Sequence, residues 1–225
     1  MKAMILAAGR GKRMMPLTKN TPKPLLKIHE KPLIEYSIEA LKKAGVTDII
    51  INTAYLGEQI QAYLGDGTKF GVQVQYSIEQ NALETAGGII QALPLLGNSP
   101  FIVINSDVLC DVDLSTLALP NNSLAHLLLV DNPEHNLNGD FSLNGNQINL
   151  ANTQTYTFSG IGLYHPDFFP SHLHNQQKIP LSSLFQKAIK SGKLTGEYYS
   201  GYWQDIGTPE RLELADNSIG GLLHK

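Results

Sequence analysis

The sequence predicts an α/β fold: a mixed, mainly parallel sheet with flanking helices and antiparallel additions in its second half. In the first 105 residues, short apolar runs alternate with segments of helical periodicity, which is the order of a parallel sheet. Beyond them, extended runs follow one another directly, and Asn144-Gly145 is a typical hairpin turn between two of them. We therefore expect parallel strands first and antiparallel strands later.

The first half is expected to form four strands and three helices. Ligands of such sheets lie beyond the carboxyl ends of the strands, so residues that follow the first and fourth strands can share a ligand. The predicted strands are Lys2 to Leu6, Asp48 to Thr53, Val72 to Ser77 and Phe101 to Asn105. The predicted helices are Leu33 to Ala44, Leu56 to Leu64 and Thr85 to Leu93.

The second half is expected to be richer in strands. Period-two and apolar runs bounded by Gly, Pro and Asn indicate them, and Thr208 followed by Pro209 marks the start of a last helix. The predicted strands are Ala125 to Val130, Asp140 to Leu143, Gln147 to Leu150, Tyr156 to Tyr164, Glu197 to Tyr199 and Tyr202 to Asp205. The predicted helices are Leu181 to Lys190 and Pro209 to Ile219.

Composition narrows the class of protein. A chain of 225 residues can form one large domain over 1–225. A net charge of −3 disfavours nucleic acid as the main partner, and no apolar run approaches a membrane span. Cys110 is the single cysteine, which rules out an intrachain disulfide. We expect a cytoplasmic protein that uses small molecules and is a monomer or small homo-oligomer.

A glycine-rich basic loop follows the first strand. Gly9 and Gly11 let the backbone approach a ligand and point N–H groups at it, and Arg13 and Lys23 add positive charge nearby. A Walker loop is excluded because it needs two glycines five residues apart, whereas Gly9 and Gly11 are two apart. A dinucleotide-binding fingerprint is excluded because Met14 stands where its third glycine belongs. The loop therefore predicts a site for a polyphosphate.

Three segments carry a resemblance to a known family. Leu6 to Leu25 resembles the signature of the sugar-1-phosphate nucleotidyltransferases, L-A-A-G-x-G-x-R-x-x-P-x-T-x-x-x-P-K-P-L, at every named position. Leu83 to Gly88 resembles the family's L-x-T-A-G-G turn, and Trp203 to Thr208 resembles its W-x-D-I-G-T segment. The resemblance implies the Rossmann-like fold of nucleotide-diphospho-sugar transferases, with a nucleotide-binding half over 1–110 and a sugar-binding half over 111–225.

The resemblance also implies a metal-assisted transfer. Arg13, Lys23 and Asp107 are the implied catalytic residues, and Asp107 and Asp205 are the implied ligands of Mg²⁺. A sugar 1-phosphate is mostly anionic near neutral pH, so the attack needs no general base. Charge neutralisation and in-line positioning would then supply the catalysis.

Two further sets of residues are implied as binding groups. The first contacts the nucleotide, and Glu79 and Gln80 stay open as alternatives for reading the base. It comprises Ala7, Ala8, Gly9, Gly11, Arg13, Lys23, Glu79, Thr85, Gly87, Gly88 and Asn105. The second contacts the sugar and comprises Glu84, Asn105, Asp140, Ser159 and Gly160.

The substrates follow from weaker motifs. Gly139-Asp140-Phe141 and Phe158-Ser159-Gly160-Ile161 resemble the bacterial members that join UTP to N-acetylmuramate 1-phosphate during peptidoglycan recycling. Other acceptors and nucleotides remain open: glucose or mannose 1-phosphate with UTP, dTTP or GTP, and phosphocholine with CTP. A regulator that binds nucleotides without catalysis is a further alternative, although the charged residues of the implied site are all present.

Overall fold

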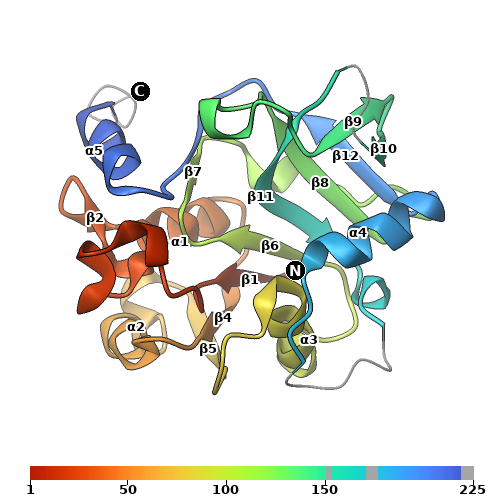
Figure 1. The fold of residues 1–225 in the computed structure, drawn as a ribbon. Coiled ribbons are helices and arrows are strands. Elements are labelled where there is room, and N and C mark those ends of the chain that lie inside the picture. Colours follow the sequence, from red (N-terminus) through yellow and green to blue (C-terminus); the bar gives the residue numbers. More distant parts are fainter. Residues whose placement is uncertain (151–153, 171–176, 219–225) are drawn as a thin grey trace.

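A nine-stranded mixed sheet runs through the whole molecule (Figure 1). The computed structural model describes residues 1–150, 154–170 and 177–218, so Ile219, the expected end of the last helix, lies outside them. The strand order is β5-β4-β1-β6-β11-β8-β12-β10-β9. The strands are β1 (Lys2–Leu6), β4 (Asp48–Thr53), β5 (Gln73–Ile78), β6 (Phe101–Asn105), β8 (Ala125–Val130), β9 (Phe141–Asn144), β10 (Gln147–Leu150), β11 (Thr157–Tyr164) and β12 (Leu194–Tyr198).

The expected α/β fold is confirmed. Strands β5, β4, β1 and β6 pair in parallel, and β11 pairs antiparallel with both β6 and β8. Strand β11 therefore joins the two halves of the chain into one sheet. Strand β12 begins at Leu194, three residues before the predicted strand, and pairs in parallel with β8.

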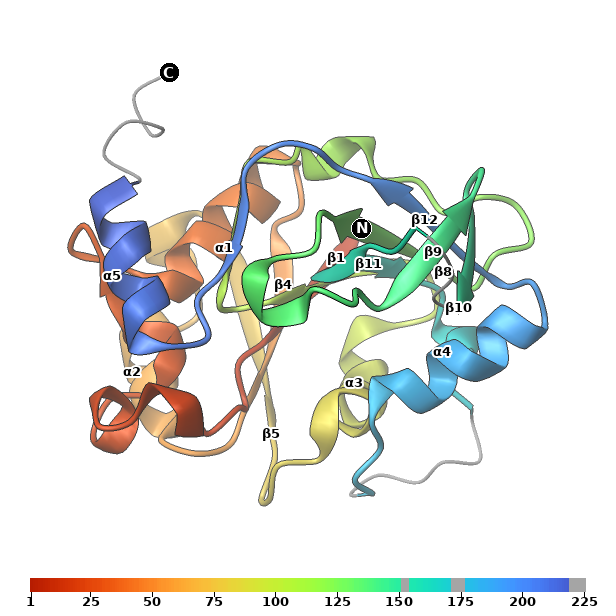
Figure 2. The same ribbon diagram turned by 45° about the horizontal axis from the view of Figure 1, so that its top comes forward.

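Helices cover both faces of the sheet (Figure 2). They are α1 (Leu33–Lys43) and α2 (Gly57–Leu64) on one face and α3 (Glu84–Leu96) and α4 (Leu181–Lys190) on the other. Helix α5 (Pro209–Ser218) packs outside the sheet. Side chains alternate across a strand, so Met4 of β1 packs in the core beneath α3 and α4, while Ile5 packs in the core beneath α1 and α2. None of the helices in the described part of the chain is long and apolar enough to cross a membrane.

Two short pairings, absent from the sequence prediction, complete the fold. Strands β2 (Lys27–Ile28) and β3 (Lys31–Pro32) form a small hairpin, and β7 (Val108–Cys110) pairs antiparallel with β13 (Trp203–Asp205). The second pairing brings a segment near the end of the chain beside the residues that follow β6. It also supports α5, which packs near β2 through a small core that contains Ile28, Leu109 and Ile206.

Candidate active site

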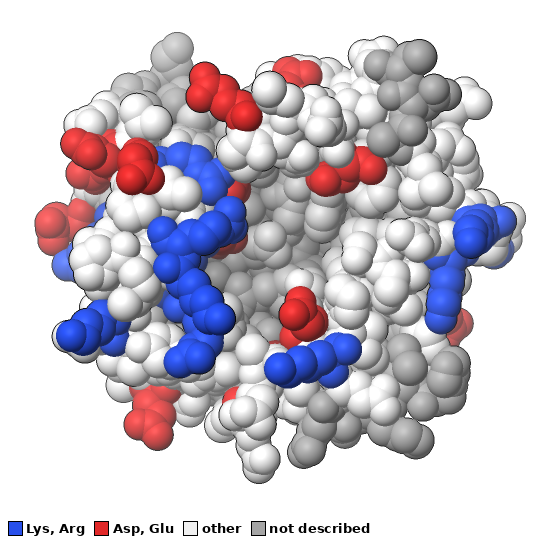
Figure 3. All heavy atoms as spheres, in the orientation of Figure 1, with Lys and Arg blue, Asp and Glu red and all other residues white. Residues whose placement is uncertain are grey.

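The carboxyl ends of the parallel strands open into a hollow of about 440 Å³. It is lined by the loop after β1, the end of β4, the segment between β5 and α3, the end of β6 and Gly207. The expectation that residues after the first and fourth strands share one edge is thus confirmed. Figure 3 shows this central hollow with a band of Lys and Arg side chains along one side.

The loop after β1 winds through three short 3₁₀ turns, Lys12–Met14, Leu17–Lys19 and Lys23–Leu25. Gly11 starts the first turn with a φ of 62°, a left-handed conformation that glycine adopts without strain. The Thr18 hydroxyl donates to the Gly11 carbonyl at 2.8 Å. The loop is therefore tied back on itself, and it holds Lys12, Arg13 and Lys23 along the hollow.

Lys23 and Asp107 form an ion pair across the hollow. Lys23 lies in the third turn of the loop and Asp107 follows β6, so the contact joins residues 84 apart in sequence. Their side chains are 13% and 23% exposed. Because a half-buried ion pair is screened less than one in open solvent, the pair links the basic loop firmly to the end of β6.

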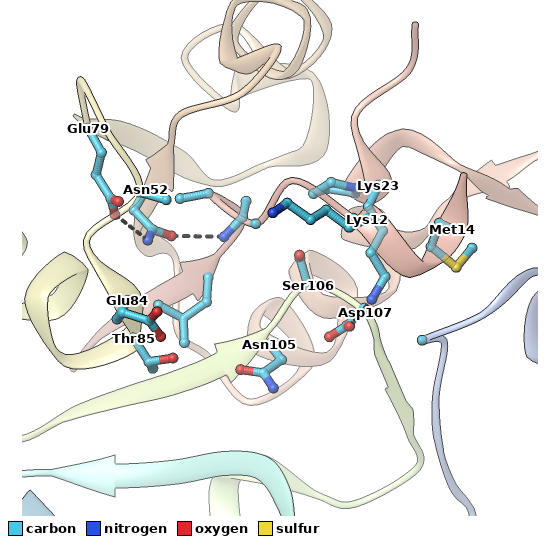
Figure 4. Close-up of a pocket in the computed structure, with 18 of the residues that line it drawn as sticks. Lys12, Met14, Lys23, Asn52, Glu79, Glu84, Thr85, Asn105, Ser106 and Asp107 are labelled. Atoms are coloured by element: carbon cyan, nitrogen blue, oxygen red, sulfur yellow. Dashed lines mark hydrogen bonds and ion pairs between the residues drawn. The ribbon is translucent and has the colours of Figure 1, made fainter. Parts of the chain in front are cut away.

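A buried chain of hydrogen bonds lies under the opposite end of the hollow (Figure 4). The Ala7 N–H donates to Asn52 Oδ1 at 2.8 Å, and Asn52 Nδ2 donates to Glu79 Oε1 at 2.7 Å. The Leu83 N–H donates to Glu79 Oε2 at 2.9 Å. Burial raises the pKa of the Glu79 carboxyl, against the opposing effect of the bonds from Asn52 and Leu83.

Most of the predicted nucleotide-binding residues line this hollow. Glu79 lines it whereas Gln80 is exposed and does not. The predicted residues in its lining are Ala7, Ala8, Gly9, Gly11, Arg13, Lys23, Glu79, Glu84, Thr85, Asn105 and Asp107. These residues come from three stretches of the chain: the loop after β1, the segment from Glu79 to Thr85, and the end of β6 with Asp107.

Gly87 and Gly88 do not line the hollow, since both are buried inside α3. The Gly87 N–H donates to the carbonyl of Ile179 at 3.2 Å, and a Cβ at Gly87 would lie 2.3 Å from the carbonyl oxygen of Gln177. A Cβ at Gly88 would lie 2.5 Å from Glu79 Oε1. Close packing around both glycines therefore accounts for the absence of side chains there.

Three of the predicted sugar-binding residues also lie outside the lining. Asp140 accepts a hydrogen bond from the Phe158 N–H at 2.8 Å, and Ser159 Oγ accepts one from the Ile161 N–H at 3.1 Å. Gly160 has a φ of 82°, and a Cβ there would lie 2.5 Å from Asn105 Nδ2. These residues support β11 and the Asn105 side chain, which does face the hollow.

The backbone of Asp205 lies beside that of Asp107 in space, but the Asp205 side chain faces another hollow. The Ile206 N–H donates to the Asp107 carbonyl at 2.8 Å. The Asp205 carboxylate pairs with Arg211 Nη1 at 2.6 Å and with His135 Nε2 at 3.1 Å, beside a hollow of about 420 Å³. Within the described residues, no group of three or more His, Cys, Asp or Glu side chains could hold a metal ion.

Sequence reasoning missed Asn52 and Gly207, which both line the main hollow. A signal for Asn52 exists in the sequence, because it ends an apolar run just as Asn105 does. Gly207 is the glycine of the W-x-D-I-G-T segment, but that segment alone does not place it at the hollow. It reaches the hollow only because β13 pairs with β7.

Comparison with known proteins identifies relatives over the whole chain. The family model described as nucleotidyl transferase matches residues 2–220. The N-acetylmuramate alpha-1-phosphate uridylyltransferase of Neisseria meningitidis is 47% identical over 231 residues, covering 98% of this chain and 99% of the relative. The D-glycero-alpha-D-manno-heptose 1-phosphate guanylyltransferase of Campylobacter jejuni is 32% identical, with 93% and 96% covered.

A solved structure has the same fold. The crystal structure of a candidate glucose-1-phosphate thymidylyltransferase from Bacillus anthracis superposes with a TM-score of 0.84 at 29% identity. The match covers 96% of this chain and 94% of the other. The sheet and its flanking helices are therefore shared over nearly the full length.

Proposed function

The chain belongs to the nucleotidyl transferase family, and from that premise we propose that it transfers the uridylyl group of UTP to N-acetylmuramate 1-phosphate. The products are UDP-N-acetylmuramate and pyrophosphate. The observation that carries the proposal is the full-length likeness to the Neisseria relative whose name states this activity. The basic loop along the main hollow supports it, because both substrates are polyanions.

In the proposed reaction, a phosphate oxygen of the sugar 1-phosphate attacks the α-phosphorus of UTP. One P–O bond forms, the bond to the β-phosphate oxygen breaks, and pyrophosphate leaves with the electron pair. Arg13 and the N–H groups beside Gly11 bind the β- and γ-phosphates, and Lys23 binds the phosphates that meet at the reaction centre. Positioning and charge neutralisation then lower the barrier, without a general base.

We include Mg²⁺ in the proposal, with Asp107 and Asp205 as the residues that hold it. Both residues offer the carboxylate oxygens that a hard cation prefers, and they lie on neighbouring backbone segments. The Asp205 carboxylate faces the second hollow, where it pairs with Arg211, so it would have to turn toward Asp107 to share the ion. Mg²⁺ bound there supplies positive charge to the α-phosphate. In the structure Lys23 pairs with Asp107 and Arg211 pairs with Asp205, so an ion held by these carboxylates would replace the two side chains as their partner.

The remaining binding residues belong to the same proposal. Ala7, Ala8, Gly9 and Thr85 form the walls of a slot for the base, and they line one end of the hollow. Glu84 and Asn105, which also line the hollow, contact the sugar. Gly160 of β11 packs against Asn105, while Ser159 of β11 and Asp140, just before β9, hold the backbone of β11. Both halves, 1–110 and 111–225, then act as one domain, which the shared sheet supports.

A cytoplasmic location, a role in peptidoglycan recycling and a monomeric or small homo-oligomeric state complete the proposal. The substrates support the first two, since UTP is a cytoplasmic nucleotide and N-acetylmuramate is a cell-wall sugar.

The test is a substrate panel read as pyrophosphate release. UTP, CTP, dTTP and GTP are each combined with N-acetylmuramate, glucose and mannose 1-phosphates and with phosphocholine, in Mg²⁺. We expect the highest kcat/KM for UTP with N-acetylmuramate 1-phosphate, and loss of turnover in Asp107→Asn. Absence of release with that pair refutes the proposed substrates, and full activity of Asp107→Asn refutes the metal site.

A further inference from the structure

The buried hydrogen bonds beneath the main hollow connect its two walls. Ala7 directly follows β1 and begins the basic loop, while Leu83 precedes α3 on the other side. Both line the hollow. The side chains of Asn52 and Glu79 lie between the backbone N–H groups of these two residues. Three hydrogen bonds of 2.7 to 2.9 Å run from Ala7 to Asn52, from Asn52 to Glu79, and from Leu83 to Glu79.

Only one orientation of the Asn52 amide satisfies all three hydrogen bonds of this path. Two backbone N–H groups, those of Ala7 and Leu83, occupy the ends, so the side chains between them must offer an acceptor at each end. One amide and one carboxylate satisfy this condition. Asn52 accepts from Ala7 and donates to Glu79, and Glu79 accepts at both oxygens.

The path is also enclosed. Asn52, near the carboxyl end of β4, and Glu79, just after β5, are each 4% exposed. Gly88 packs against them from α3, where a Cβ would lie 2.5 Å from Glu79 Oε1 and 2.8 Å from Asn52 Nδ2. Since both oxygens of Glu79 are engaged by protein donors, its carboxylate has a structural partner on each side.

We propose that Asn52 and Glu79 are positioning residues that hold the two walls of the nucleotide slot at a fixed separation. Glu79 acts on the nucleotide through the backbone at Ala7 and Leu83, and not by reading the base. This inference rests on the proposed function, because it takes the main hollow as the nucleotide site. It assigns a role to Asn52, which no motif pointed to.

The test exploits the pattern of donors. Glu79→Gln replaces one acceptor by an NH₂ group, which must face either the Asn52 amide or the Leu83 N–H. Adding Asn52→Asp restores every bond: the new carboxylate at position 52 accepts from Ala7 and from the new amide at position 79, whose oxygen accepts from Leu83. The double variant has the same net charge as the natural protein.

A mispaired buried donor should weaken UTP binding by about tenfold in E79Q, measured as Kd by calorimetry. The KM for UTP is expected to rise in parallel, with kcat and the acceptor KM changed less than about threefold. The N52D/E79Q double variant is expected to return the UTP Kd to within about threefold of the natural protein. Thermal unfolding of each variant is recorded alongside.

Each outcome decides the inference. A UTP Kd unchanged in E79Q, or a double variant that binds UTP no more tightly than E79Q, overturns the positioning role. Where E79Q does not fold, Gly88→Ala decides, because it pushes on the same two side chains while favouring the helix; a UTP Kd unchanged in that variant also overturns the role. Failure of the natural protein to bind UTP refutes the proposed function itself and is seen in the first titration.

Discussion

Gly11→Ala should destabilise the protein and loosen the basic loop. Gly11 has a φ of 62°, and a left-handed conformation costs a residue with a Cβ about 1–2 kcal/mol. The new methyl group would also lie 2.8 Å from Thr18 Cγ2 and 3.2 Å from Lys23 Cβ. Moving those side chains off their preferred rotamers adds about 0.5–1.5 kcal/mol.

The total loss is about 1.5–3.5 kcal/mol in the free energy of unfolding, because the two effects add at one site. For a chain of this size that corresponds to a fall in Tm of ~3–14 °C. Urea unfolding measures the loss of free energy. It is followed by the fluorescence of Trp203, the single tryptophan, and by circular dichroism.

Gly9→Ala is the matched control for stability. A Cβ at Gly9 meets no heavy atom within 4 Å, and its φ is not positive. Its free energy of unfolding should therefore stay within about 0.5 kcal/mol of the natural protein or rise slightly. Equal stability of the Gly11→Ala and Gly9→Ala proteins would contradict the reasoning, since it would mean that neither the left-handed backbone nor the contact with Thr18 constrains position 11.

Three other predictions concern single buried groups. Tyr164→Phe should raise the free energy of unfolding by about 1–3 kcal/mol, because the Tyr164 hydroxyl is fully buried without a partner among the described residues; a destabilised variant would count against this. Burial lowers the pKa of His126 below its usual 6.5, so the folded state resists protonation and stability falls as the pH drops from 6.5 through the lowered pKa. Urea unfolding at pH 7.5 and pH 5.5 should show a smaller loss in His126→Gln than in the natural protein. Burial raises the pKa of the Cys110 thiol to about 12, so its reaction with a disulfide reagent at pH 8 should be at least about a hundredfold slower in the folded protein than in urea; comparable rates would refute this.

Local patterns were sufficient for most of the fold. The boundaries of β1, β4, β6, β8 and α4 match the predicted ranges, because each is a continuous apolar run or an amphipathic helix with clear end signals. Glu84 and Pro94 were left outside the predicted helix, yet α3 spans Glu84–Leu96. Packing of its apolar face against the sheet outweighs the local preferences of those residues.

Strand order and the partners of single side chains needed long-range information. The place of β11 between β6 and β8, and the pairing of β7 with β13, join residues 27 to 97 positions apart, which no local pattern encodes. The same holds for Asp205, whose carboxylate faces Arg211 and His135, and for Asn52, which one hydrogen bond ties to Glu79.

The sequence by itself determined the chemistry of this protein: a run of glycines, arginine, lysine and proline after the first strand is specific enough to indicate a polyphosphate site and a family. Tertiary structure alone decided that Asn52 faces that site and that Asp205, Gly87 and Gly88 do not. Hydrogen bonds across the ends of β1, β4 and β5 and the pairing of β7 with β13 set those positions, because such contacts depend on strand order and register.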